Sequence, residues 1–130
     1  MKDLAQPGGE ACATDQVLYN VTRRGIEFDL LPALAAQKIP VMAYSPVEQA
    51  RLPKSGALAA VAARHGVTIY QVALAWVLRH PHVIAIPKAA HARHVRENRA
   101  AADLKLTPQD LAEIDAAFPP PRRKTSLAML

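Results

Sequence analysis

Cysteine, aromatic residues and long hydrophobic runs are all scarce in this chain of 130 residues. Cys12 is the one cysteine, which excludes an intramolecular disulfide and is typical of proteins in a reducing compartment. We therefore expect a cytoplasmic protein. Cys12 lies in an apolar, strand-like run, which favours a buried, unreactive thiol over a nucleophile.

No apolar run approaches the roughly 20 residues that a membrane-spanning helix needs. Met1–Gly9 lacks the apolar core of a signal peptide. CxxC and HExxH motifs are also missing, and His65, His80 and His82 have no metal-ligand partner four residues away. We therefore expect no metal site, and we interpret each of these histidines as a surface or hydrogen-bonded side chain.

The remaining composition is that of one globular domain with a core of its own, because 51% of the residues are hydrophobic. The net charge of +5 suits an anionic ligand, with nucleic acid as the competing partner class. The basic residues are scattered, and their one tight cluster is Arg122–Lys124, beside a run of prolines. This distribution makes nucleic acid the weaker hypothesis.

Apolar runs of strand length alternate with amphipathic segments along the chain. This alternation predicts an α/β fold with a parallel sheet whose strands are buried on both faces. We expect strands over Ala11–Tyr19, Ile39–Ala43 and Val83–Ile86, and helices over Glu27–Gln37, Ser55–Arg64, Ile69–Arg79, His91–Ala101 and from Thr107 onward. Asn20–Gly25 is expected to be a polar turn, Pro46–Ser55 a loop, and Pro119–Pro121 the end of the ordered part.

Local signals mark several helix ends. Thr68 and Gln71 form a T-x-x-Q capping box, and Gly66 provides a stop for the helix before it. Pro108 occupies a first helical position, with Asp110 in the first turn. The apolar spacing predicts these inward-facing side chains: Leu30, Leu31, Leu34, Leu58, Val61, Ala62, Leu111, Ile114, Ala117 and Phe118. The helix from Ile69 is apolar nearly all round and should have neighbours on both sides.

Lys88 follows the third predicted strand at the point where the next helix begins. A basic side chain beside the free N–H groups of a helix start is suited to a phosphate. On pattern alone, a solvated lysine remains the commoner alternative.

Longer stretches of sequence are more specific than this pattern. The words QVLYN, RGIEFDLLP, IPVMAYSPV, HGVT, QVALAWVLRHP and VIAIPKA occur in an order and at distances that resemble the aldo-keto reductase family, from about Gly9 to the C-terminus. The resemblance implies a TIM barrel with ligands at the carboxyl ends of its strands. Residues 1–130 would form the C-terminal part of that domain, namely its last three βα units and a terminal helix.

The resemblance also implies which residues bind NADPH. Gln16 matches the glutamine that contacts the nicotinamide carboxamide. Tyr44 matches the aromatic residue that stacks on the nicotinamide ring, with a core tyrosine at a strand end as the alternative. The loop of Ser45, Pro46 and Val47 matches the segment that lines the pyrophosphate.

The resemblance likewise implies which residues bind the adenosine end of the cofactor. Lys88 matches the residue that binds the 2′-phosphate, which favours NADPH over NADH. Glu97 and Asn98 match the pair that reads the adenine edge, although a solvated helix face would have the same pattern. His94 occupies a position where an arginine commonly packs on the adenine.

Some positions depart from the family pattern. Glu48 would add a negative charge close to where the phosphates lie. Ala89 and Ala90 occupy positions where relatives often have serine and a second polar or aromatic residue, so two contacts would be lost. Either Arg93 or Arg96 could supply the arginine that packs on the adenine.

The family's catalytic aspartate, tyrosine, lysine and histidine belong to the first half of the barrel, and their motifs are absent here. Tyr19 and Tyr70 are not assigned that role, because a general acid needs a lysine that tunes its pKa. We therefore assign no catalytic residue. We expect the cofactor-binding part of a reductase of small aldehydes or ketones, inactive alone. The alternative is a non-catalytic interaction module, or a half-barrel that pairs with itself or with a separate first half, because three strands cannot close a barrel.

Overall fold

A computed structural model describes residues 11–54 and 56–130 of the chain. Its sheet has three strands in the order β1-β2-β3, and both neighbouring pairs are parallel. The strands are β1 (Asp15–Leu18), β2 (Val41–Tyr44) and β3 (Val83–Ala85). The predicted α/β fold with a parallel sheet is therefore confirmed.

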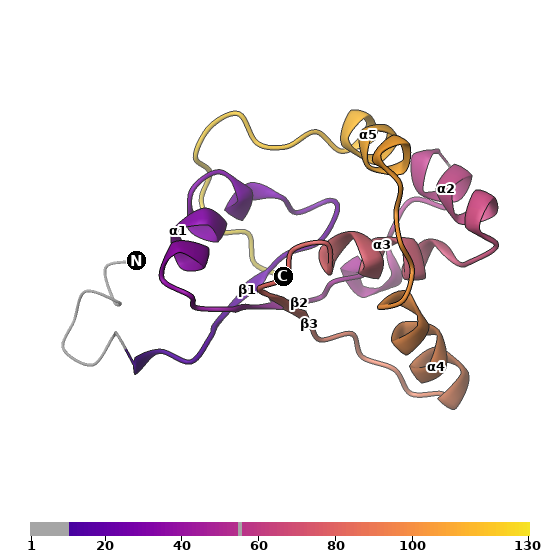
Figure 1. The fold of residues 1–130 in the computed structure, drawn as a ribbon, viewed down its shortest axis with the longest axis horizontal. Helices are drawn as coiled ribbons and strands as arrows, with labels where there is room; N and C mark the ends of the chain where they lie inside the picture. The colour runs from indigo at the N-terminus through magenta and orange to yellow at the C-terminus, as the bar shows by residue number, and fades with distance from the viewer. Residues whose placement is uncertain (1–10, 55) are drawn as a thin grey trace.

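Five α-helices connect and cover these strands within the described residues (Figure 1). They are α1 (Leu30–Ala36), α2 (Ala57–His65), α3 (Ile69–Val77), α4 (Ala92–Ala101) and α5 (Pro108–Ala117), with the 3-10 turns η3 (Gly25–Glu27) and η4 (Glu48–Ala50). Helix α3 contacts α2, α4 and β3, and its residues 72–77 are all buried, which confirms the prediction of neighbours on both sides. None of the described helices is by itself long and apolar enough to cross a membrane.

The two faces of the sheet differ in burial. The covered face carries Val17, Val41, Ala43 and Val83, all at most 7% exposed. On the other face Gln16 is paired with Met42 and Met42 with Ile84, and Ile84 is 45% exposed. Ile86 is 39% exposed. The prediction that the third strand is buried on both faces is therefore wrong, because β3 is an edge strand with no described helix over this side.

The first strand is shorter than predicted. It begins at Asp15, whose N–H donates to Pro40 O at 3.1 Å. Pro40 has no N–H of its own, so the ladder cannot extend further in that direction through it. Cys12 therefore lies before the strand and is half-buried, which corrects the expectation of a buried thiol within a strand.

Two predicted helix ends are confirmed, and one falls outside the described residues. Thr68 Oγ1 accepts from Gln71 N at 3.2 Å, and Gln71 Oε1 accepts from Thr68 N at 3.1 Å. Gly66 ends α2 at a φ of 65°, where a side chain would be strained. The proposed cap at Ser55 lies outside the described residues. Helix α3 ends at Val77, two residues short of the predicted end.

Most predicted core positions are buried, at 9% exposed or less: Leu30, Leu31, Leu34, Leu58, Val61, Ala62 and Ile114. Leu111 and Phe118 are half-buried and pack against the core. Ala117 is exposed, so its prediction is wrong, because Ile114 and Phe118, one turn apart, are the side chains that face the core at this end of α5.

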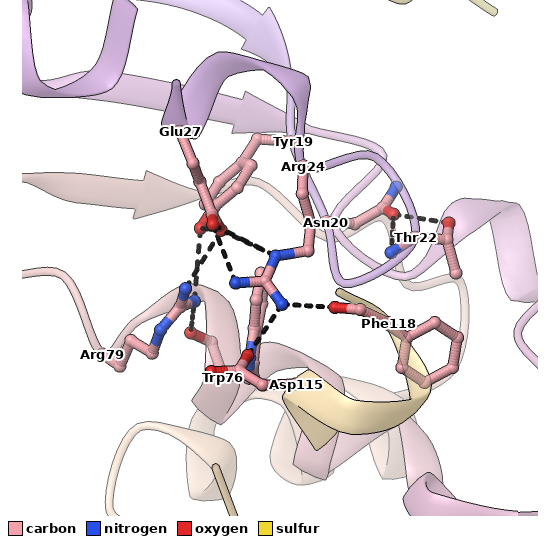
Figure 2. Close-up of polar contacts among 9 residues, drawn as sticks. All are labelled: Tyr19, Asn20, Thr22, Arg24, Glu27, Trp76, Arg79, Asp115 and Phe118. Carbon is pink, nitrogen blue, oxygen red and sulfur yellow. Dashed lines mark hydrogen bonds and ion pairs between the residues drawn. The ribbon is translucent and has the colours of Figure 1, made fainter. Parts of the chain in front are cut away.

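A buried charge cluster joins the segment after β1, residues 19–29 (the β1 loop), to two helices (Figure 2). Arg24, only 8% exposed, donates to Glu27 Oε2 at 2.8 Å, to Asp115 Oδ1 at 2.7 Å and to the Phe118 carbonyl. Its guanidinium carbon lies 4.9 Å from the centre of the Trp76 ring. The expected polar turn over residues 20–25 is confirmed, since Arg23 N donates to Asn20 O at 3.0 Å, and this turn also carries a buried ion pair.

Tyr19 and Arg79 complete the cluster. The Tyr19 hydroxyl donates to Glu27 Oε1 at 2.7 Å, and Arg79 Nη2 donates to the same oxygen at 3.0 Å. Burial raises the pKa of Tyr19 far above its usual value. Burial opposes the ionisation of Glu27, but hydrogen bonds from Arg24 and Tyr19 outweigh it and keep the Glu27 pKa below its usual value. The Tyr19 hydroxyl is thus a structural donor.

The chain after α5 returns toward the strands (Figure 1). Lys124 Nζ pairs with Asp29 Oδ2 at 2.8 Å. A Cβ atom on Gly25 would lie 2.6 Å from Thr125 Oγ1, so the tail approaches the β1 loop closely. The prediction that Pro119–Pro121 ends the ordered part is therefore wrong, and Lys124 of the basic cluster is engaged in an ion pair.

Helix α5 is attached to α2 through one buried carboxylate. Thr107 and Asp110 form a capping box, in which Asp110 Oδ2 accepts from Thr107 N at 2.8 Å. The Asp110 side chain is 0% exposed and also contacts Arg64 and, at 2.7 Å, His65 Nε2. Burial opposes its ionisation, but hydrogen bonds from His65 and Thr107 prevail and hold the Asp110 pKa far below its usual value. The hydrogen-bonded interpretation of His65 is confirmed.

We predict that Asp110 makes stability depend on pH in acid. Because its pKa is lowered on folding, its contribution is complete above the unfolded value of 3.8 and is lost as the pH falls below it. Asp110→Asn should lower the free energy of unfolding by about 2 kcal/mol at pH 7 and flatten its fall between pH 5 and 3. Urea denaturation across this range measures both effects. Asp103→Asn, at a side chain 73% exposed, should change little; an equal loss there would contradict the assignment.

Candidate functional site

Two adjoining hollows lie beyond the carboxyl ends of β2 and β3. The larger hollow has a volume of about 520 Å³. It lies between residues 45–50, which follow β2 and are called the β2 loop, and the segment after β3. The smaller, of about 220 Å³, extends to α3 and α4. Val47, Ala50, Lys88 and His94 line both, so the two are continuous. Seven of the residues predicted to contact the cofactor line these hollows: Ser45, Pro46, Val47, Lys88, His94, Glu97 and Asn98.

Gln16 and Tyr44 lie on the sheet and line neither hollow. Gln16 is paired with Met42, and Tyr44, the last residue of β2, is paired with Leu18. Because side chains alternate along a strand, Gln16 and Tyr44 share the uncovered face. Tyr44 is half-buried and so is not a core tyrosine. Ser45, the next residue, lines the larger hollow.

Positive charge gathers around the smaller hollow. Lys88, Arg93 and His94 line it, and Glu97 is the one carboxylate among its lining residues. Arg93 Nε donates to Glu97 Oε1 at 2.8 Å, so that carboxylate is already neutralised. Of the two arginines left open as adenine partners, Arg93 lines the hollow and Arg96 does not. This wall is suited to an anionic ligand.

Glu48 does not present a free charge to the hollows. It is 6% exposed and accepts from Asn20 Nδ2 at 2.7 Å and from Arg23 Nη2 at 2.9 Å. Burial opposes its ionisation, but hydrogen bonds from Arg23 and Asn20 keep the Glu48 pKa below its usual value. The predicted negative charge beside the phosphates is therefore wrong, because the carboxylate is directed inward and paired.

Asn20 is a residue that sequence reasoning missed, since it was placed in a polar turn. It is 0% exposed, and its Oδ1 accepts from Thr22 N at 2.9 Å. Asparagine side chains often hydrogen-bond the backbone two residues later, so the sequence YNVT could have indicated that the Asn20 side chain is held within the turn.

The β2 loop contains several residues other than glycine in the left-handed region. The φ angles are 48° at Ser45, 49° at Glu48, 53° at Gln49 and 63° at Ala50. Each such residue costs about 1 kcal/mol and persists where surrounding contacts enforce it. The wall of the larger hollow is thus a strained segment.

His80 and His82 lie apart from the hollows described above. Their rings are 5.9 Å apart, and among the described residues neither buried Nε2 atom has a hydrogen-bond partner. The expectation of surface or hydrogen-bonded histidines is wrong for both, because the turn between α3 and β3 places them against the interior. Burial, followed by the charge of Arg79, lowers the pKa of His80. No three metal-ligating side chains of the described residues lie close enough together to hold an ion.

Residues 5–118 match the aldo/keto reductase family. The chain belongs to this family. Among the relatives of the chain, methylglyoxal reductase YeaE of Escherichia coli (strain K12) is 47% identical over 136 residues, covering 100% of the chain and 48% of that protein. The chain therefore spans about half the length of the curated relatives it matches.

Solved structures agree. An aldo-keto reductase from Klebsiella pneumoniae in complex with NADPH is 47% identical and superposes with a TM-score of 0.95, covering 99% of this chain and 48% of that one. A second Klebsiella pneumoniae structure, with NADP and acetate, is 45% identical with a TM-score of 0.95 and covers 100% and 49%. The resemblance in the sequence is confirmed, and the fold matches about half of the family's barrel. The roles of the individual cofactor residues stay predictions.

We predict that replacing one left-handed residue with glycine stabilises the chain. Ala50→Gly removes a strained Cβ at a φ of 63° and should raise the free energy of unfolding by about 1 kcal/mol. Urea denaturation measures the change.

The matched control is Ala60→Gly, on an exposed position of α2. It should lower the free energy of unfolding by about 1 kcal/mol, because glycine weakens a helix interior. The same sign for both variants would contradict the left-handed loop.

Proposed function

We propose that this chain is the cofactor-binding end of a cytoplasmic, NADPH-dependent reductase of aldehydes and ketones. Its strands would be the last three of the eight in the barrel. The observation that carries the proposal is the hollow beyond β3, where Arg93 pairs with the one lining carboxylate, Glu97, and Lys88 is a lining cation with no ion-pair partner among the described residues. The similarity to Klebsiella pneumoniae enzymes in complex with NADPH and NADP supports it.

The donor set fits a phosphorylated dinucleotide. Lys88 would bind the 2′-phosphate as a point charge, and the loop from Ser45 to Val47 would line the pyrophosphate. Gln16 offers an amide for the nicotinamide carboxamide, and Tyr44 offers a ring face. When bound, the cofactor supplies a hydride for the carbonyl carbon. The role of these side chains is to bind and orient it.

The proton for the carbonyl oxygen is not assigned to this chain. Tyr19 donates its hydroxyl proton to Glu27 within the buried cluster. The Tyr70 hydroxyl donates to Ala50 O at 3.3 Å and has no lysine assigned to tune it. We therefore propose that the proton donor comes from the part of the barrel that precedes these strands.

The substrate class we propose is small, reactive aldehydes such as methylglyoxal. The support is the 47% identity to methylglyoxal reductase YeaE over 100% of the chain. A compact dicarbonyl would need few contacts from this half of the barrel.

The exposed side chains on one face of β3 and just after it support a second role as a half-barrel that pairs. Ile84 is 45% and Ile86 39% exposed, and both outer edges of the sheet lack a neighbouring strand among the described residues. We propose that a polypeptide carrying the remaining barrel strands covers this face. Two copies of this chain would fall short of the eight strands of a closed barrel, which argues against simple self-pairing.

We predict that Lys88 distinguishes the two dinucleotides. Lys88→Met should raise the Kd for NADPH about tenfold and leave that for NADH within about twofold, because one charge-assisted contact to the 2′-phosphate is lost. Isothermal titration calorimetry measures both.

The control for this experiment is Lys105→Met. Lys105 is exposed and lines neither hollow of the site. Its replacement should leave both affinities unchanged, and an equal loss in both lysine variants would indicate a bulk charge effect instead.

We also predict that the chain alone does not oxidise NADPH with methylglyoxal above a blank without protein. Addition of the segment of methylglyoxal reductase YeaE that precedes the matched region should give a one-to-one complex by light scattering, together with turnover. Ile84→Asp should weaken that complex about tenfold or more, because it places a charge in an apolar contact. Turnover by the chain alone, or an unchanged complex with Ile84→Asp, would count against the proposal.

A further inference from the structure

One buried amide joins the β1 loop to the β2 loop. Asn20 is 0% exposed. Its Nδ2 donates to Ser45 O at 2.9 Å and to Glu48 Oε2 at 2.7 Å. Both protons of the amide are therefore used in contacts to a segment 25 or more residues away in sequence.

The other end of the same amide is also held. Asn20 Oδ1 accepts from the backbone N–H of Thr22 at 2.9 Å and from its hydroxyl at 2.8 Å (Figure 2). Two donors on the oxygen fix which end of the amide points to the β2 loop. The orientation of the Asn20 amide is thus fixed by Thr22, independently of its bonds to Ser45 and Glu48.

Glu48 is fixed from a second side. Arg23 donates to its Oε1 from Nε at 3.2 Å and from Nη2 at 2.9 Å. The Glu48 side chain is 8% exposed, whereas that of Arg23 is 44% exposed, so the carboxylate is the buried partner. Removal of its donors would leave a buried carboxylate without compensation.

The two residues that Asn20 contacts are both in the left-handed region, at φ values of 48° for Ser45 and 49° for Glu48. Strained residues keep their conformation only where other contacts enforce it. Asn20 and Glu48 line neither hollow, whereas Ser45, Val47 and Ala50 line the larger one. The hydrogen bonds of Asn20 therefore restrain the loop that forms the wall of the larger hollow, although Asn20 itself does not line that hollow.

We infer that Asn20 is a positioning residue that, through Ser45 O and Glu48, holds the loop of residues 45–50 in the shape that binds the dinucleotide. The identity of the ligand rests on the proposed function, but the restraint on the loop does not. The β1 loop is anchored separately by the Arg24 cluster, and the strands by their own register, so the fold does not depend on Asn20 alone.

The test is Asn20→Asp, which has the same shape, keeps an oxygen for Thr22 and removes both donors. The probes are the backbone N–H groups of Glu48, Ala50 and Arg51, which bond within the loop at 2.9–3.0 Å. Their hydrogen exchange should become about tenfold faster or more, while that of α3 is unchanged. Thr22→Val, which removes one bond to the amide oxygen only, should leave all of them within about twofold.

A rescue separates positioning from general stability. In the double variant N20D/E48Q the direction of the hydrogen bond is reversed, because the new amide can donate to the new carboxylate. Loop exchange should return part of the way to that of the original chain, because the bond between residues 20 and 48 is restored and the bond to Ser45 O is not. Unchanged loop exchange in Asn20→Asp, or faster exchange throughout α3, would overturn the inference. If Asn20→Asp does not fold, Asn20→Ser, which adds no charge, is judged by the same criteria.

Binding of the two dinucleotides completes the test. Asn20→Asp should raise the Kd for NADPH and for NADH by a similar factor, about tenfold, because the loop faces the pyrophosphate that both share. A loss confined to NADPH would overturn the inference. If the original chain binds neither dinucleotide, the proposed function fails, and the exchange of the loop amides still decides the role of Asn20.

Discussion

Arg24 is the residue on which the arrangement of the chain depends most. It is buried, and it joins the β1 loop to α3 through Trp76 and to α5 through Asp115. Opening a buried pair by removing one partner costs about 3 kcal/mol or more, because the other charge stays behind without compensation. The loop that Arg24 anchors also carries Asn20, which reaches the β2 loop. The shape of the hollow beyond β2 therefore depends, in part, on ion pairs that lie outside its lining.

The main core of the described residues lies on one side of the sheet. The fully buried side chains Leu58, Val72 and Trp76 belong to α2 and α3, which contact each other. The chain superposes on about half of a Klebsiella pneumoniae aldo-keto reductase with a TM-score of 0.95. On the opposite face of the sheet an apolar side chain, Ile84, remains in contact with solvent.

Features with local causes could be predicted from the sequence. The capping box at Thr68, the stop at Gly66 and the apolar surface of α3 each depend on neighbours within a turn or two. Lys88 and His94 fall on one wall because a parallel sheet brings its strand ends to one edge, and the family words locate that edge.

Features that depend on distant partners could not be predicted. Glu48 turns inward because Asn20, 28 residues earlier, supplies a donor, and no spacing rule reveals that pairing. The return of the tail depends on Asp29, and the burial of His80 and His82 depends on how α3 meets β3.

Trp76 is the only tryptophan in the sequence, and it is fully buried. Its ring is flanked by the guanidinium groups of Arg24 at 4.9 Å and Arg79 at 3.6 Å. Arg79 follows the end of the same helix, whereas Arg24 comes from the β1 loop, so the fluorescence of Trp76 should respond to the contact between that loop and α3. Trp76 emission should therefore change when Arg24 leaves the ring. Trp76 lines neither of the two hollows that would receive a dinucleotide.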